Sequence, residues 1–167
     1  MASMIEPVRS VILRELRALD REIAAYPDDA SVWKAPEGIS NSAGNLALHM
    51  AGNLRHFIGG VLGGSGYVRD RDAEFKSTGL SREELRAIVA SAIDELTQAF
   101  DKITDEQLSR EFPLPIAERK LRASDFITHL AVHLSYHLGQ LDYHRRLLTP
   151  GAKPVDTVSP KELPQIE

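Results

Sequence analysis

Apolar residues recur every three or four positions in four separate stretches of the chain, each roughly 20 residues long. This spacing places them on one face of an α-helix. The pattern therefore predicts helices over 4–25, from 41 or 42 to 62, from 82 to about 103, and over 124–148. The first of them shows the stripe most clearly, at Ile5, Val8, Ile12, Leu16, Leu19 and Ile23. Four helices that each have one apolar face predict an all-α fold, a four-helix bundle.

Polar residues mark the starts of three of these helices. Asn41 or Ser42 precedes the second helix and suits an N-cap, whose side chain satisfies a free backbone N–H. Ser81 and Glu84 have the spacing of a capping box at the start of the third helix. Ser124 is the expected cap of the fourth.

The connections between the helices are long. Residues 63–80 show no helical pattern, and at ~3.3 Å per residue they can cross the full length of a bundle, which permits two consecutive helices to run parallel. Segment 111–120 contains two prolines and predicts an extended stretch or a small hairpin. We expect one domain over 1–150 and an extended C-terminal tail over 151–167.

Composition excludes several classes of function. The net charge of −4 leaves no basic surface for nucleic acid and no polybasic patch for a membrane. No apolar run approaches the ~20 residues that cross a bilayer, and the first residues lack a signal-peptide pattern, so we expect a cytoplasmic protein. There is no cysteine, which excludes disulfides, zinc–thiolate sites and a cysteine nucleophile.

The fourth predicted helix carries four of the six histidines. At 100° per residue, His133, His137 and His144 point to the same side as the apolar Phe126 and Leu130. Burying polar rings is costly unless each finds a partner, and a metal ion is such a partner.

His133 and His137 are four positions apart, which places their rings on one helix face roughly 5–6 Å apart, close enough to share one ion. A third ligand must come from another element. His49 in the second helix is the best candidate, and His56, two turns further on, is the reserve. Three neutral imidazoles leave open positions on zinc, nickel or a similar ion, which is typical of a catalytic site.

The competing interpretation is that these histidines are structural, because an H-x-x-x-H pair alone is a weak motif. His129 lies at the edge of the face, and His144 lies two turns beyond His137. We expect both to be structural, His144 through hydrogen bonds in the core or near the end of the bundle. Three polar residues are expected to orient the ligand rings: Gln140, Tyr136 and Asn53.

Other catalytic motifs are absent: the chain contains no H-E-x-x-H, P-loop, G-x-S-x-G or G-x-G-x-x-G sequence. Most carboxylates fall on predicted exposed faces. Asp72 and Glu74, in the long connection, are the acidic residues that suit acid–base chemistry. The favoured alternative is a loop in which they pair with Arg69 and Arg71.

Two stretches resemble a known family. The run HLSYHLGQLDYHRR (133–146) resembles the last helix of the DinB/YfiT-like superfamily of metalloenzymes, and NSAGNLALHMAGNLRHFIGG (41–60) resembles its second helix. RDRDAEF (69–75) is similar to one branch of that superfamily. The resemblance spans most of residues 5–148 and is weaker in the first and third helices.

The resemblance implies a bundle of up-down-down-up topology and a three-histidine metal site at His49, His133 and His137. It also implies dimers, and for several relatives a transferase or isomerase activity that uses a low-molecular-weight thiol such as mycothiol, bacillithiol or glutathione. A second apolar edge of the last helix could pack on a neighbouring helix or a second subunit: Val132, Tyr136, Tyr143 and Leu147.

We therefore expect a metal-dependent enzyme, with zinc or nickel as the leading metals, that joins a small-molecule substrate to an external thiol. The nearest alternative is a hydrolase that uses metal-activated water. The other is a non-catalytic, stress-related bundle protein that binds a metal or small ligand.

Overall fold

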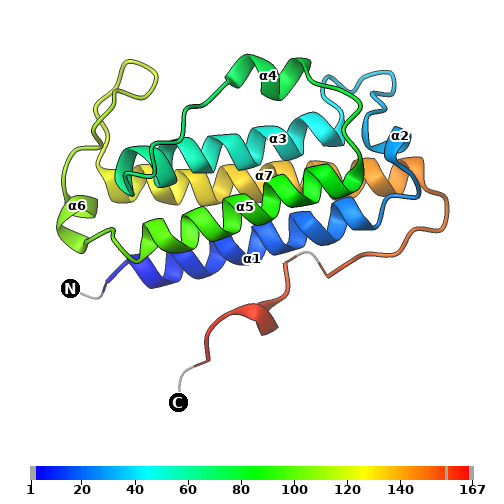
Figure 1. Ribbon diagram of the computed structural model, residues 1–167. Helices are drawn as coiled ribbons and strands as arrows, with labels where there is room; N and C mark the ends of the chain where they lie inside the picture. The colour runs from blue at the N-terminus through cyan, green and yellow to red at the C-terminus, as the bar shows by residue number, and fades with distance from the viewer. Residues whose placement is uncertain (1–2, 157, 166–167) are drawn as a thin grey trace.

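The computed structural model describes residues 3–156 and 158–165, and over these residues the fold is helical with no β-strand. Figure 1 shows four long helices side by side, which confirms the predicted all-α class. The long helices are α1 (Ile5–Ala24), α3 (Ala43–Leu54), α5 (Arg82–Phe100) and α7 (Ala123–Leu148). Short helices interrupt the connections: α2 (Asp29–Val32), α4 (Arg71–Lys76) and α6 (Asp105–Ser109).

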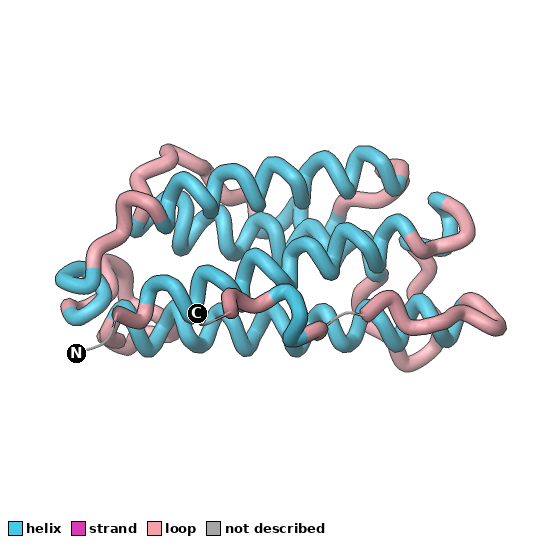
Figure 2. The backbone as a smooth tube through the Cα atoms, turned by 90° about the horizontal axis from the view of Figure 1, so that it is seen from below, coloured by secondary structure: helices cyan, strands magenta, loops and turns pink. Residues whose placement is uncertain are grey.

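Most connections gather at the two ends of the long helices (Figure 2). A single 3₁₀ turn (Pro160–Glu162) forms in the tail, where the Arg21 side chain of α1 binds the Glu162 carboxylate and the Asp156 carbonyl. In the described part of the chain, no helix has both the length and the hydropathy that a membrane span requires.

Two predicted helix starts are confirmed and one is wrong. The Ser42 side chain accepts a hydrogen bond from the backbone of Asn45, and Ser81 forms the complete capping box with Glu84. Helix α7, however, begins at Ala123 with no side-chain cap, so Ser124 lies inside its first turn.

A backbone contact explains the early start of α7. The N–H of Ala123 donates to the carbonyl of Arg110 at 2.9 Å, so this free amide is satisfied by the segment before the helix. That segment forms the predicted hairpin, with isolated bridges between Glu111 and Arg122 and between Ile116 and Arg119.

The second long helix changes its hydrogen-bonding pattern before it ends. Residues Arg55–Leu62 form a π-helix that continues α3, and the N–H of Gly63 donates to the carbonyl of Ile58 at 2.9 Å. Gly64 then adopts a φ of +68°, a left-handed conformation that terminates the helix at little cost. The predicted end at residue 62 is confirmed.

The core also holds charged groups that the helical pattern did not predict. Glu22 is fully buried and accepts a hydrogen bond from the nearly buried Arg145 of α7 at 2.5 Å. Arg14 and Glu15 form a second buried ion pair. The expectation that most carboxylates lie on exposed faces is therefore wrong for these glutamates. Each of them is buried beside an arginine, which offsets part of the cost of removing a charge from water.

Candidate metal centre

Three histidine side chains from two helices converge at one point of the bundle. His49 comes from α3, and His133 and His137 come from α7. One ring nitrogen of each lies within 4.8 Å of the others, and the Nε2 atoms of His133 and His137 are 3.0 Å apart. The His49 ring centroid lies 5.2 Å from each of the other two.

The sequence predicted that His133 and His137 lie within the buried face of the last helix, but in the structure they lie at the margin of that face. The buried side chains of the helix around them include Leu130, Leu134 and Leu138, whereas the rings of His133 and His137 are only half-buried. Helix α7 packs against both α1 and α3. The two imidazoles therefore have access to the surface while His49, at 7% exposure, closes the site from within.

The buried Glu74 carboxylate orients His49. Its Oε2 lies 3.0 Å from His49 Nδ1, and the Arg69 guanidinium donates to both carboxylate oxygens at 2.6 and 2.7 Å. Burial alone would raise the pKa of Glu74, but hydrogen bonds from Arg69 and His49 lower that pKa below its usual value. An ionised carboxylate only accepts, so the His49 proton sits on Nδ1 and Nε2 is free to face the other rings.

Gln140 orients His137 in the same way. Its Oε1 lies 2.7 Å from His137 Nδ1, and an amide oxygen also only accepts, so the proton is again on Nδ1. Burial lowers the pKa of His137. Burial, followed by the neighbouring His137 and His49, lowers the pKa of His133 to about 4, so these rings are neutral near pH 7.

The three residues fit a divalent cation. Imidazoles that each present one nitrogen to a common point are the donor set that zinc, nickel and related ions bind. A carboxylate or amide on the opposite ring nitrogen is the arrangement that orients metal-binding histidines in proteins. The cluster could therefore hold a metal ion, and its chemistry does not identify which one.

The remaining histidines are not members of the three-residue group, although the His129 ring stacks on that of His133 at 6.0 Å between centroids. His129 is exposed and stacks on Phe126, which fits a structural role. His144 is buried, with Nδ1 2.7 Å from the Tyr26 hydroxyl and Nε2 2.8 Å from the Lys34 carbonyl, so the predicted hydrogen-bonded core position is confirmed. His56 packs against Phe57 and lies outside the group.

The residues predicted to orient the rings have different outcomes. Gln140 does so, and Tyr136 contacts His137 edge to face at 5.3 Å between centroids. Asn53 is buried, and in the described chain its Oδ1 has no hydrogen-bond partner. The hydrogen-bond partner of His49 is Glu74 instead, which Arg69 holds in place.

The long connection supplies these partners through a short helix. Asp70 caps α4 by accepting from the backbone of Ala73, and this turn carries Glu74 onto α3. The predicted pairing of Glu74 with Arg69 is present, but it is buried against His49, whereas Asp72 pairs at the surface with Lys76. Helix α4 was not predicted from the sequence, and the signal that could have revealed it is Asp70, a residue type that favours the N-cap of a helix.

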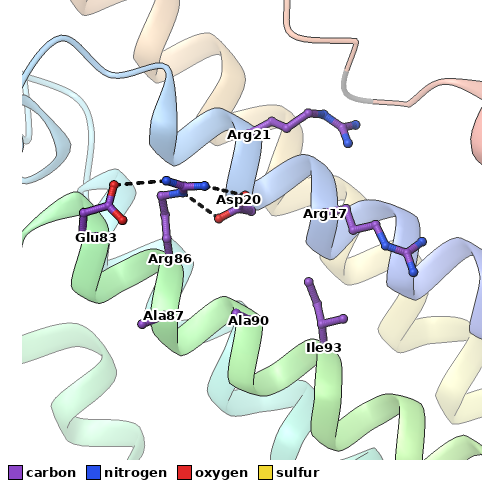
Figure 3. Close-up of a pocket in the computed structure, with 8 residues that line it drawn as sticks. All are labelled: Arg17, Asp20, Arg21, Glu83, Arg86, Ala87, Ala90 and Ile93. Carbon is purple, nitrogen blue, oxygen red and sulfur yellow. Dashed lines mark hydrogen bonds and ion pairs between the residues drawn. The ribbon is translucent and has the colours of Figure 1, made fainter.

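A cavity of about 460 Å³ between α1 and α5 is a poorer candidate (Figure 3). Its lining is mainly charged, and the charges are largely paired with one another: Arg86 binds both Asp20 and Glu83. None of the histidines lines it. The three-histidine cluster is therefore the site with the clearer chemistry.

A family model described as a protein of unknown function, DUF1572, matches residues 2–155, nearly the whole chain. No curated protein and no solved structure matches this chain.

Proposed function

We propose that this chain, which belongs to the DUF1572 family of proteins of unknown function, is a metal-dependent enzyme in which His49, His133 and His137 bind one divalent cation. The observation that carries the proposal is the convergence of three imidazoles, two of which donate the N–H of the ring nitrogen facing away from the cluster to a hydrogen-bond acceptor. Zinc or nickel is the metal we propose, because both bind imidazole nitrogen readily.

Such an ion would lower the pKa of a thiol or water bound beside the histidines and so supply a nucleophile near neutral pH. The chain's own groups orient the ligands and set the charge of the site. Glu74 holds the Nδ1 proton of His49, and Gln140 holds that of His137. Arg69 keeps the Glu74 carboxylate ionised, so the negative charge nearest to the cluster is itself neutralised.

We further propose membership of the DinB/YfiT-like superfamily and a transferase reaction that uses a low-molecular-weight thiol. The helix motifs around His49 and His137 support this, as does a family match that covers the same stretch. The up-down-down-up order is supported by the path of the ribbon, in which α3 and α5 run the same way (Figure 1). With no cysteine in the chain, the thiol must come from outside, and the cytoplasm is where such thiols are kept reduced.

A homodimer is also part of the proposal. The four side chains of the second apolar edge of α7 are 63–71% exposed: Val132, Tyr136, Tyr143 and Leu147. Sedimentation velocity of the wild type and of Val132→Glu tests this. We expect a dimer that the glutamate dissociates, and a monomeric wild type would contradict the proposal.

The metal is tested on tag-free protein by elemental analysis. We expect near one equivalent of zinc or nickel per chain in the wild type. In His133→Ala the metal content should fall at least tenfold, because only two of the three ligands remain. His129→Ala removes an exposed imidazole one turn away and is the matched control. Equal, negligible metal in the wild type and His133→Ala would overturn the site.

The reaction is then tested by turnover of electrophiles with and without added thiol. We expect turnover that requires both metal and thiol. Turnover without thiol would favour the hydrolase, and metal binding without any turnover would favour a non-catalytic role.

A further inference from the structure

A second cavity, of about 590 Å³, opens directly beside the three-histidine cluster. His137, one of the cluster's three rings, forms part of its wall. The volume lies in the range of cavities that bind small molecules. Of the three cavities described here, it is the one whose lining includes a residue of the cluster.

Two elements form the walls of this cavity. One wall is α7 from Tyr136 to Leu147, and the other is the connection before α3, residues 38–41. His144 fastens this connection to the helix: its Nε2–H donates to the Lys34 carbonyl, and its Nδ1 accepts from the Tyr26 hydroxyl. Because both nitrogens are engaged, His144 holds the wall in place and has no free nitrogen to offer a ligand.

The lining carries no formal charge. Apart from the neutral histidines, its side chains are aromatic, aliphatic, hydroxyl or amide, and Asn41 and Gln140 supply the amides. The other cavities differ: that between α1 and α5 contains three arginines and two acids (Figure 3). A third contains Asp94, Glu95 and Lys102. A charged ligand in the cavity beside His137 would lose its hydration without meeting an opposite charge.

The rings of Tyr136 and Tyr143 make the α7 wall of the cavity aromatic. Both lie along the cavity on the exposed edge of α7, with Leu147 beyond them, while Ile39 and Leu46 line the other side. Aromatic faces of this kind pack well on a flat, apolar ligand. The amide of Gln140 and the cluster at His137 mark one polar end.

We propose that this cavity binds the uncharged co-substrate of the enzyme, a small molecule with an aromatic or similarly flat apolar part whose polar end faces His137. The inference rests on the proposed function. It also implies that a thiol with ionised carboxylates, such as glutathione, occupies a different position, because its carboxylates would meet no cationic side chain in this lining.

The test is calorimetric titration of the full-length chain, both zinc-loaded and treated with EDTA. The probes are 4-nitrobenzyl alcohol and 4-nitrobenzoate, which share one ring and differ in charge. We expect saturable one-to-one binding of the alcohol to both forms, and at least tenfold weaker binding of the benzoate to the EDTA-treated form. The proposal would be overturned if the alcohol showed no saturable binding, or if the EDTA-treated form bound the two probes with equal affinity.

Two variants of exposed residues locate the binding. Tyr143→Glu adds a charge to the wall and should weaken binding of the alcohol at least tenfold. Val132→Glu adds the same charge to the same edge, outside the cavity. Because both variants would dissociate the proposed dimer, comparing them isolates the cavity, and Val132→Glu should leave affinity within twofold. An equal loss in both would show that a second copy of the chain builds the groove, against the proposal. Far-ultraviolet circular dichroism verifies that both variants are folded.

Failure of this inference is distinguishable from failure of the proposed function. If the EDTA-treated chain binds the alcohol but the wild type never retains metal, the cavity assignment stands and the metalloenzyme does not. If metal content and thiol-dependent turnover are normal but Tyr143→Glu leaves probe binding unchanged, the enzyme stands and the cavity assignment is overturned.

Discussion

The Glu74 carboxylate lies directly against the backbone of Gly52. A Cβ at position 52 would come closer than 3.0 Å to Glu74 Oε1, a distance that real Cβ contacts essentially never show. The glycine thus makes room on α3 for the carboxylate that orients His49 one turn earlier.

The substitution Gly52→Ala tests this relationship. In metal-free protein we expect a loss of about 1–3 kcal/mol in the free energy of unfolding by urea, because the added methyl forces the carboxylate to move. Gly139→Ala is the matched control, since a Cβ on this exposed helical glycine of α7 meets nothing within 4 Å. It should stabilise the protein by about 0.5–1 kcal/mol. Similar effects of the two alanines would contradict the packing described here.

The hydrogen bond from His137 to Gln140 should matter for metal affinity. Gln140→Ala removes the acceptor on Nδ1, so the ring loses its fixed orientation, and we expect affinity for zinc to fall about 10–100-fold. Competition with a chromogenic chelator measures this. Gln98→Ala, an exposed glutamine on α5, is the control and should leave affinity unchanged. Unchanged affinity in Gln140→Ala would mean that the hydrogen bond does not support the site.

The adjacent arginines of α7 should differ strongly in their effect on stability. Arg145→Met leaves the fully buried Glu22 carboxylate without its guanidinium partner, and we expect a loss of about 3–5 kcal/mol in the free energy of unfolding. Arg146 pairs with Asp142 at the surface, where an ion pair contributes about 1 kcal/mol or less, so Arg146→Met should have little effect. Urea denaturation of both variants at pH 7 gives the comparison, and equal losses would refute a special role for the buried pair.

Stability should depend on pH through His144. Burial lowers the pKa of this imidazole from its ordinary value of 6.5. Below pH 6.5 the unfolded chain therefore binds a proton that the folded chain does not, and the free energy of unfolding falls as pH decreases toward the folded-state pKa. Above pH 6.5 this contribution is constant.

The measurement compares the wild type with His144→Gln at pH 7.5 and 5.5. We expect the stability difference between them to shrink at pH 5.5, because the variant lacks the titrating ring. His129→Gln, an exposed position on the same helix, reports changes that are unrelated to burial. A difference that is the same at both pH values would contradict the prediction.

Local features of the chain were predictable because they depend on neighbours in sequence. The apolar spacing predicted the four long helices, and the Ser81–Glu84 capping box and the end of the second helix at residue 62 were confirmed. The start of α7 was not predictable, because its first amide is satisfied by Arg110, which lies outside the helix.

For the candidate site, the sequence by itself determined that His133 and His137 share one helix face, since four residues make about one turn. Only the tertiary structure decided that His49 meets them and that Glu74 and Arg69 lie behind it. It also decided that Glu22 is buried against Arg145. The physical reason is the same in each case: burying a polar group is costly unless a partner compensates it, and these partners are 20 or more residues away along the chain.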